Sequence, residues 1–226
     1  MVPVGTTAQR RVTPAALFED VTKRYEDGSL ALDRLRVEIG AGERVLVTGP
    51  TGSGVTTFLR VLSGRSMVTG GRARVLGIPI HLADHRAIRR LRSRVGMLER
   101  ALHLPAECRV GEAMELAATS ADRYPDSSTG TLDRLGGPAP HRKAGDLDAV
   151  EQALLGLAMV AVRRPKLVVA DDPWGHLDPG VGLAIGGLAA RLFAEREAAF
   201  VLAGRDAGAF DGLDRAIRLL GGRVVA

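Results

Sequence analysis

Three short runs of residues have a continuous apolar centre, at positions 44–48, 167–170 and 199–203. A strand that is covered on both faces of a parallel sheet shows continuous rather than alternating apolarity, so each run predicts a buried central strand. Each run is followed by a turn and a helical pattern, at residues 55–63, 181–195 and 206–210. The repeated order of strand and helix predicts an α/β fold with a mostly parallel central sheet.

The rest of the chain has two other patterns. Residues 16–39 and 71–80 contain short strand-like stretches with turns at 26–28 and 77–79, which predict a separate antiparallel β layer. Residues 105–152 are helical in pattern at both ends, which predicts a small helical subdomain. Its middle, residues 120–145, is rich in Ser, Gly, Pro and Asp, so we expect a loop or a partly disordered excursion there and a shortened subdomain.

The length of 226 residues suits one core, so we expect a single domain with residues 1–14 as a leader outside it. The longest apolar stretches, 153–162 and 181–190, fall well short of the roughly 18 to 20 residues that cross a bilayer. No apolar signal core follows Arg10 and Arg11, which predicts a cytoplasmic protein. Cys108 is the only cysteine, which excludes an internal disulfide and a thiol zinc cluster.

The formal net charge is +5 and the pI is near 10.1. This balance can indicate nucleic acid or acidic lipid as a partner, although a genome-wide arginine bias would produce the same charge. At helical spacing, the densest basic run would wrap most of a helix rather than one face, and no aromatic residue interleaves it as a single-strand-binding surface requires. Nucleic acid is therefore not the favoured partner. The run consists of Arg86, Arg89, Arg90, Arg92 and Arg94.

A glycine-rich loop follows the first apolar run. It fits the phosphate-binding pattern G-x-x-x-x-G-K-[ST] at every position but one, because Val55 stands where the lysine belongs. Backbone N–H groups of such a loop point at phosphate oxygens, the following helix adds its positive end, and Thr56 would supply a hydroxyl for magnesium. The missing charge-assisted bond, about 1.5 to 3 kcal/mol, should weaken ATP binding by about 10- to 150-fold. The candidate phosphate-binding residues are Gly49, Thr51, Gly52, Ser53, Gly54, Val55, Thr56 and Thr57.

Taken in order, the motifs resemble those of ABC-type ATPases, and most closely those of the FtsE/LolD/MacB type. Residues 21–25, VTKRY, and 30–33, LALD, match the opening of these proteins, and residues 70–77 resemble their strand after the phosphate-loop helix. The resemblance covers residues 17–223. It implies a P-loop NTPase fold of the ABC cassette type, with Tyr25 stacked on the adenine of ATP or ADP.

Residues 167–173, LVVADDP, and 175–179, GHLDP, resemble the Walker B motif and the D-loop. The resemblance implies that Asp171 holds Mg²⁺ together with Thr56. The next residue in a working enzyme of this family is a glutamate that orients the attacking water, and here it is Asp172. Its side chain is one methylene shorter, and a misplacement of about 1 Å can cost on the order of 100-fold in rate.

Three further family elements are altered. The Q-loop glutamine falls on Arg100 or, with a gap, on Glu99, and the switch histidine is Arg205. The signature LSGGE-Q reads LDAVEQ at residues 147–152, where Asp148 replaces a serine near phosphate and Val150 replaces a glycine. Together the changes predict lost hydrolysis. Arg100 and Arg205 stand where the family approaches the γ-phosphate, so we expect them to face the nucleotide and partly replace the lysine charge.

The leading hypothesis from the sequence is a degenerate nucleotide-binding subunit, with weak ATP or ADP binding and little or no hydrolysis. The resemblance implies an integral membrane permease-like partner, a homodimer or heterodimer with another cassette, and a peripheral position at the inner face of the cell membrane. A second hypothesis is a slow ATPase that energises an ABC transporter or an FtsEX-like complex. A third, suggested only by the pI, is a soluble nucleic-acid-associated ABC protein.

Overall fold

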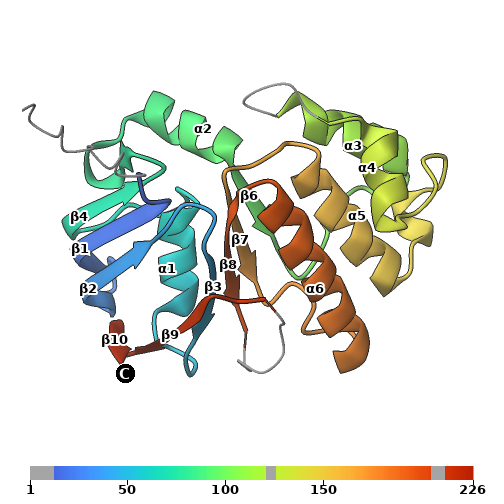
Figure 1. Ribbon diagram of the computed structural model, residues 1–226. Coiled ribbons are helices and arrows are strands. Elements are labelled where there is room, and N and C mark those ends of the chain that lie inside the picture. Colours follow the sequence, from blue (N-terminus) through green and yellow to red (C-terminus); the bar gives the residue numbers. More distant parts are fainter. Residues whose placement is uncertain (1–12, 121–125, 205–211, 226) are drawn as a thin grey trace, which may run out of the picture.

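The protein contains two β-sheets (Figure 1). Its structure is a computed structural model that describes residues 13–120, 126–204 and 212–225. The first sheet is antiparallel, with strand order β2-β1-β4-β5. The second has the order β10-β9-β3-β8-β7-β6, and its strands are parallel except for the β9–β10 pair. The first sheet consists of β1 (Ala16–Arg24), β2 (Leu30–Ile39), β4 (Gly70–Val75) and β5 (Ile78–Pro79). The second consists of β3 (Arg44–Thr48), β6 (Val95–Leu98), β7 (Leu167–Asp171), β8 (Ala199–Ala203), β9 (Arg215–Leu220) and β10 (Arg223–Val225).

Helices complete the layers on both sides of the parallel sheet. The apolar face of α1 (Val55–Leu62) packs in one core cluster with residues of both sheets. A second cluster lies between the other face of the parallel sheet and α3 (Val110–Thr119), α4 (Ser128–Leu135), α5 (Ala149–Ala161) and α6 (Pro179–Glu195). The remaining helix, α2 (His85–Arg94), lies apart from these and leads directly into β6 (Figure 1).

The structure confirms the three central strands and the antiparallel layer, with the second strand extending to Asp171. The loop expected over residues 120–145 is wrong in part, because α4 lies within it. This helix begins after Ser127, whose hydroxyl accepts a hydrogen bond from the Gly130 N–H at 3.3 Å, and it ends at Gly136 with φ of 62°. Burial of Leu132 stabilises a segment whose composition favours a turn. The helix predicted at 206–210 and residues 1–12 of the predicted leader lie outside the described residues.

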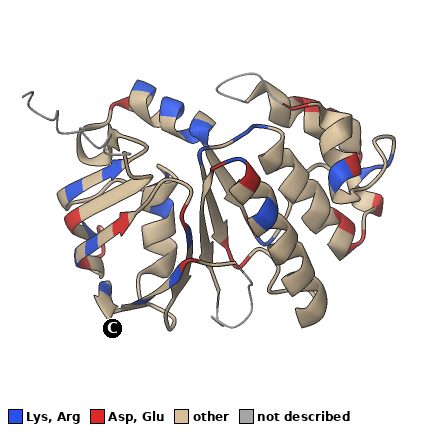
Figure 2. Cartoon of the chain, in the orientation of Figure 1, with Lys and Arg blue, Asp and Glu red and all other residues tan. Residues whose placement is uncertain are grey.

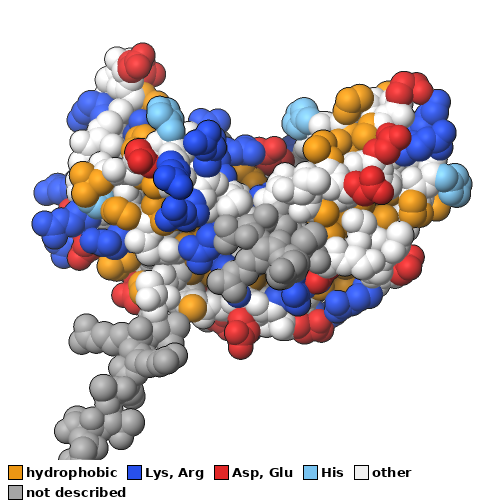
Figure 3. Space-filling view, turned by 90° about the horizontal axis from the view of Figure 1, so that it is seen from above, with side chains coloured by type: hydrophobic (Ala, Val, Ile, Leu, Met, Phe, Trp, Pro, Cys, Tyr) orange, Lys and Arg blue, Asp and Glu red, His pale blue; other side chains and the backbone are white. Residues whose placement is uncertain are grey.

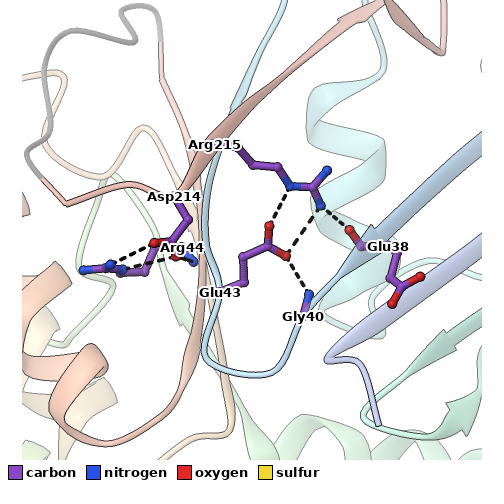
Figure 4. A network of polar contacts seen from close by, with 6 residues as sticks. All are labelled: Glu38, Gly40, Glu43, Arg44, Asp214 and Arg215. Carbon is purple, nitrogen blue, oxygen red and sulfur yellow. Dashed lines mark hydrogen bonds and ion pairs between the residues drawn. The ribbon is translucent and has the colours of Figure 1, made fainter. Parts of the chain in front are cut away.

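A polar network fixes the amino-terminal end of β3 beside β9 (Figure 4). Arg44 Nη2 lies 2.9 Å from Asp214 Oδ1, and the Arg44 backbone N–H donates to the other oxygen of that carboxylate at 2.8 Å. Arg215 Nε donates to Glu43 Oε1 at 2.6 Å, while Glu43 Oε2 accepts from the Gly40 N–H at 2.6 Å. The hydrogen bonds from Arg44 lower the pKa of Asp214. The network therefore holds β3 in position at its amino-terminal end, and the glycine-rich loop begins at the other end of the same strand.

Within the described part of the chain, no helix combines the length and the apolar character that crossing a membrane requires.

Candidate functional site

The glycine-rich loop, residues 49–54, turns tightly between β3 and α1. Gly52 and Gly54 have φ angles of 80° and 99°, which L-residues rarely adopt. A Cβ atom on Gly54 would lie 2.3 Å from the Ala31 carbonyl oxygen, so no other residue fits there without movement of the backbone. The Ser53 N–H donates to the Pro50 carbonyl at 3.0 Å, which closes the turn. The loop therefore has the conformation that its glycine spacing predicts.

The turn between β9 and β10 clamps this loop from outside. The Gly222 N–H donates to the Ser53 carbonyl at 2.9 Å, and the Gly222 carbonyl accepts from the Asp33 N–H at 3.0 Å. Arg223 Nη2 pairs with Asp33 Oδ2 at 2.6 Å. The sequence carries no signal for this contact, because its partners are separated by about 170 to 190 positions along the chain.

A cavity of about 490 Å³ opens above the loop. Its walls come from the loop and the start of α1, the carboxyl end of β7, the residues that follow β8, and the segment between β1 and β2. The structure brings nearly all of the predicted nucleotide-binding residues to this one cavity, but Arg100 is not among those that line it. The predicted residues in the cavity wall are Tyr25, Gly49, Thr51, Gly52, Ser53, Gly54, Val55, Thr56, Thr57, Asp171 and Asp172.

Tyr25 lies half-buried at the cavity wall and is held at its hydroxyl end. Its Oη lies 3.1 Å from Oγ1 of the buried Thr57, and the ammonium of Lys23 lies 5.0 Å from its ring centroid. The hydrogen bond with Thr57 lowers the Tyr25 pKa, and Arg60 and Lys23 add to that effect. Arg60, on α1, is a cation near the cavity that the sequence analysis missed, because no motif position marks it. The ring that the resemblance assigns to adenine is thus fixed in place by local contacts.

Asp171 and Asp172 follow one another at the end of β7. Burial raises the pKa of Asp171, and the negative charge of Asp172 raises it further, while Arg60 and Arg100 oppose the shift. Asp172 has a φ of 46°, a strained value for this residue type, and a Cβ on Gly175 would lie 2.2 Å from Asp172 Oδ1. The carboxylate therefore lies directly over Gly175.

Arg100 contacts Asp172 rather than the cavity. Its Nη2 lies 2.7 Å from Asp172 Oδ2, in an ion pair whose side chains are 51% and 36% exposed. The partner of Arg100 is therefore a carboxylate of the cavity wall, and the expectation that Arg100 faces the nucleotide stays a prediction. The physical reason for the ion pair is the parallel pairing of β6 and β7, with Leu98 opposite Ala170, which places the segments that follow the two strands next to each other. The other Q-loop candidate, Glu99, pairs with Arg65.

Arg100 also borders a second cavity, of about 370 Å³, that lies between β6, α3, α5 and the segment after β7. Leu102, Met159 and Trp174 supply apolar walls, and His103 adds a polar group. Since Asp172 lines the first cavity and Arg100 lines the second, their ion pair joins the two.

The segment at the signature position forms the start of α5. Asp148 is the N-cap of this helix and accepts a hydrogen bond from the Glu151 N–H at 2.8 Å, while Glu151 accepts from the Asp148 N–H at 3.0 Å. This capping box places a carboxylate on the positive end of the helix. Val150 is exposed in the first turn. Arg205, at the switch position, lies outside the described residues.

Comparisons with known proteins agree on one family. Residues 32–175 match the family described as "ABC transporter". The lipoprotein-releasing system ATP-binding protein LolD of Anaeromyxobacter dehalogenans is 30% identical, over 97% of this chain and 96% of its own length. LolD of Chromohalobacter salexigens is 32% identical, over 91% of both chains. The phosphonates import ATP-binding protein PhnC of A. dehalogenans is 33% identical over 74% of this chain and 36% of its own length.

Solved structures show the same fold. The ATP-binding cassette MJ0796, in a dimeric post-hydrolysis state bound to ADP and Pi, superposes with a TM-score of 0.81 at 21% identity and covers 93% of this chain and 97% of its own. The structure of cbiO1 from Clostridium perfringens, which is part of the ABC transporter complex cbiONQ, has a TM-score of 0.81 at 21% identity and covers 94% of this chain and 87% of its own. These likenesses confirm the cassette fold that the sequence predicted.

Proposed function

The chain belongs to the ABC transporter family, and from this premise we propose that it is a nucleotide-binding cassette that binds MgATP or MgADP weakly and hydrolyses ATP little or not at all. The observation that carries the proposal is the set of residues that line the phosphate-loop cavity. The backbone cradle is complete, but the position of its lysine is occupied by Val55, and Asp172 is paired with Arg100.

Nucleotide binding is supported by what remains in the cavity. The backbone of residues 49–54 supplies N–H groups to phosphate oxygens, and the start of α1 adds its positive end. Thr56 is exposed and lines the same cavity as Asp171, so the two would hold Mg²⁺, which would neutralise phosphate charge. The environment of Asp171 is suited to a bound cation. Burial and the neighbouring Asp172 carboxylate raise the pKa of Asp171 and so disfavour its ionised form, which a nearby positive charge would stabilise.

Impaired hydrolysis is supported by two features. Asp172 is one methylene shorter than the family's glutamate. Its ion pair with Arg100 also makes the carboxylate a weaker base for a water molecule. At the start of α5, the Asp148 carboxylate already occupies the positive helix end. A cassette that offered this helix end to the γ-phosphate of a partner cassette would present a negative charge to a negative ligand.

We further propose that the protein works at the inner face of the cell membrane, on an integral membrane permease-like partner and as a homodimer or heterodimer with another cassette. Support comes from the relatives, which are ATP-binding proteins of lipoprotein-releasing and phosphonate-import systems. The second cavity, with its apolar walls and the Arg100 side chain at its border, is the candidate docking place for the permease-like partner.

Calorimetry with MgATP and MgADP, combined with phosphate-release assays on the purified chain, tests the nucleotide part of the proposal. We expect weak binding of both nucleotides and phosphate release near background. Submicromolar ATP affinity with measurable turnover would instead support the slow ATPase, and a complete lack of binding would leave a purely structural subunit. Co-purification with a permease or an intact cassette encoded nearby tests the partners.

Arg205 remains a candidate contact of the γ-phosphate in this proposal, since Arg100 is engaged elsewhere. Arg205→Ala should weaken whatever ATP affinity is measured, and should affect ADP less. Equal affinities of the variant and the original protein for ATP would remove Arg205 from the site.

A further inference from the structure

The positive charge of the chain is concentrated in one segment. Residues 60–94 contain nine arginines and a single acidic residue, Asp84, although the whole chain has a net charge of only +5. The remainder of the chain is therefore net negative. A general arginine bias of the genome would raise the positive charge everywhere, so it does not explain this distribution.

The segment ends in α2, which presents three of its arginines on one face. Arg86, Arg89 and Arg90 are spaced i, i+3 and i+4, which makes them neighbours on a helix, and all three are exposed. Leu91 is buried on the opposite side, and Arg92 is turned sideways, where it donates two hydrogen bonds to the Gly64 carbonyl at 2.8 and 3.1 Å. The five arginines of the basic run therefore do not share one face, as the sequence predicts, but Arg86, Arg89 and Arg90 lie together. The exposed guanidinium groups of Arg86, Arg89 and Arg90 form a patch, which we call the α2 face.

No carboxylate among the described residues neutralises the α2 face. Neither a hydrogen bond nor an ion pair joins the side chains of Arg86, Arg89 or Arg90 to any described group. Asp84, the nearest acid in sequence, caps the helix by accepting from the Ala87 N–H at 2.7 Å. Lys and Arg colouring accordingly recurs along α2, with acidic colouring only at its start (Figure 2). Seen from above, basic side chains gather over this part of the molecule (Figure 3).

A large apolar side chain stands next to the α2 face. Leu82 ends the short helical turn Ile80–Leu82, two residues before the N-cap of α2, and it is 77% exposed. It is the most exposed large hydrophobic side chain in the described part of the chain. Guanidinium groups beside a projecting leucine are the combination that binds at the interface of an anionic bilayer, where phosphates meet acyl chains.

We propose that the α2 face and Leu82 bind directly to anionic phospholipid headgroups. Nucleic acid fits less well, because no aromatic side chain lies among the arginines to stack on bases and Leu82 would meet a polar backbone. The location leaves the phosphate-loop cavity free. α2 precedes β6 while the phosphate loop follows β3, and these strands run parallel, so the two features lie at opposite ends of the sheet. The contact is additional to any permease-like partner and does not depend on nucleotide binding.

Vesicle flotation of the full chain tests the proposal. We expect the protein to float with phosphatidylcholine vesicles that contain about 30% phosphatidylglycerol but not with phosphatidylcholine alone, and to be released between about 0.1 and 0.5 M NaCl. Arg86→Gln combined with Arg89→Gln should weaken partition by about 10- to 30-fold, because each arginine near an anionic surface contributes about 1 kcal/mol. Leu82→Ser should weaken it by about 3- to 10-fold without changing the charge.

The matched control is Arg191→Gln combined with Arg218→Gln. It removes the same charge from exposed positions on α6 and β9, far along the chain from the α2 face. It should retain vesicle binding to within about 2- to 3-fold. An equal loss in this control would show that net charge alone drives adsorption and would overturn the proposal. So would a failure to float with anionic vesicles, or arginine-dependent binding to a short DNA duplex or an acidic protein in place of lipid.

Discussion

Val55→Lys isolates the charge that the phosphate loop lacks. Val55 is the first residue of α1, lines the cavity and packs partly against the first core cluster. A lysine there can lay its apolar stem along the same surface while the ammonium enters the cavity. One charge-assisted hydrogen bond to a phosphate is worth about 1.5 to 3 kcal/mol, so calorimetry should show MgATP binding tighter by about 10- to 150-fold.

The same substitution should destabilise the protein without nucleotide. The first turn of α1 contains no acidic residue to balance a new cation, and a positive charge at a helix amino terminus costs about 0.3 to 1 kcal/mol. For a chain of this size, that corresponds to a melting temperature lower by roughly 1 to 4 °C. MgATP should then raise the melting temperature of the variant more than that of the original protein. Val55→Met is the matched control, because it adds length without charge and should leave affinity unchanged.

Phosphate release should nevertheless stay near background in Val55→Lys. Hydrolysis also needs an active base, and Asp172 remains short and paired with Arg100. When catalytic residues act as a unit, restoring only one of them recovers little of the hydrolysis rate. Val55→Lys combined with Asp172→Glu should therefore also hydrolyse ATP slowly in a homodimer that carries Asp148. Brisk turnover by Val55→Lys alone would refute this reasoning and return the chain to the working ATPases. Equal tightening by Val55→Met would refute the assignment of the gain to charge.

Three further changes probe other parts of the site. Arg100→Gln removes a largely exposed ion pair to Asp172, so denaturant unfolding should show a loss below about 1 kcal/mol. MgATP affinity should be unchanged and phosphate release should stay near background, because the loop still lacks its lysine, whereas a fall in affinity would place Arg100 at the nucleotide. Asp171→Asn should raise the melting temperature near pH 7, because the pKa of this carboxyl is raised on folding and its ionised form is disfavoured there. The gain should vanish as the pH falls toward 3.8, and a pH-independent gain would contradict it. Gly54→Ala should cost about 2 to 4 kcal/mol in unfolding free energy and remove nucleotide binding, whereas Gly52→Ala, with open space around its Cβ position, should cost only about 1 to 2 kcal/mol.

The sequence predicts those features that depend on neighbouring residues. The three central strands follow from continuous apolarity, and the phosphate loop follows from glycine spacing, because a left-handed backbone at Gly54 needs glycine wherever the rest of the chain goes. α4 escapes prediction because its residues favour turns, and its stability comes from a serine cap and from packing of Leu132 and Leu135 in the second core cluster.

The contacts that modify the site depend on the assembled sheet. Arg100 and Asp172 are 72 positions apart, and only the pairing of β6 with β7 places them together. The sequence could therefore name both residues but could not show that they pair with each other. For α2, the run of arginines could be seen in the sequence, but its face could not, since the side chain of Arg92 turns to a backbone carbonyl on another segment.

The clamp that Gly222 places on the phosphate loop bears on how the protein folds. The phosphate loop is bonded to Gly222, which is itself bonded to Asp33, so this arrangement is complete only when segments nearly 190 positions apart have met, which is a slow, high-contact-order event. On a ribosome, α1 and β3 emerge long before β10 is synthesised, so the nascent chain carries an unfinished cradle. We therefore expect nucleotide to bind and stabilise the cassette only after synthesis has passed residue 222, and to act in refolding experiments on the unfolding rate rather than on the rate of folding.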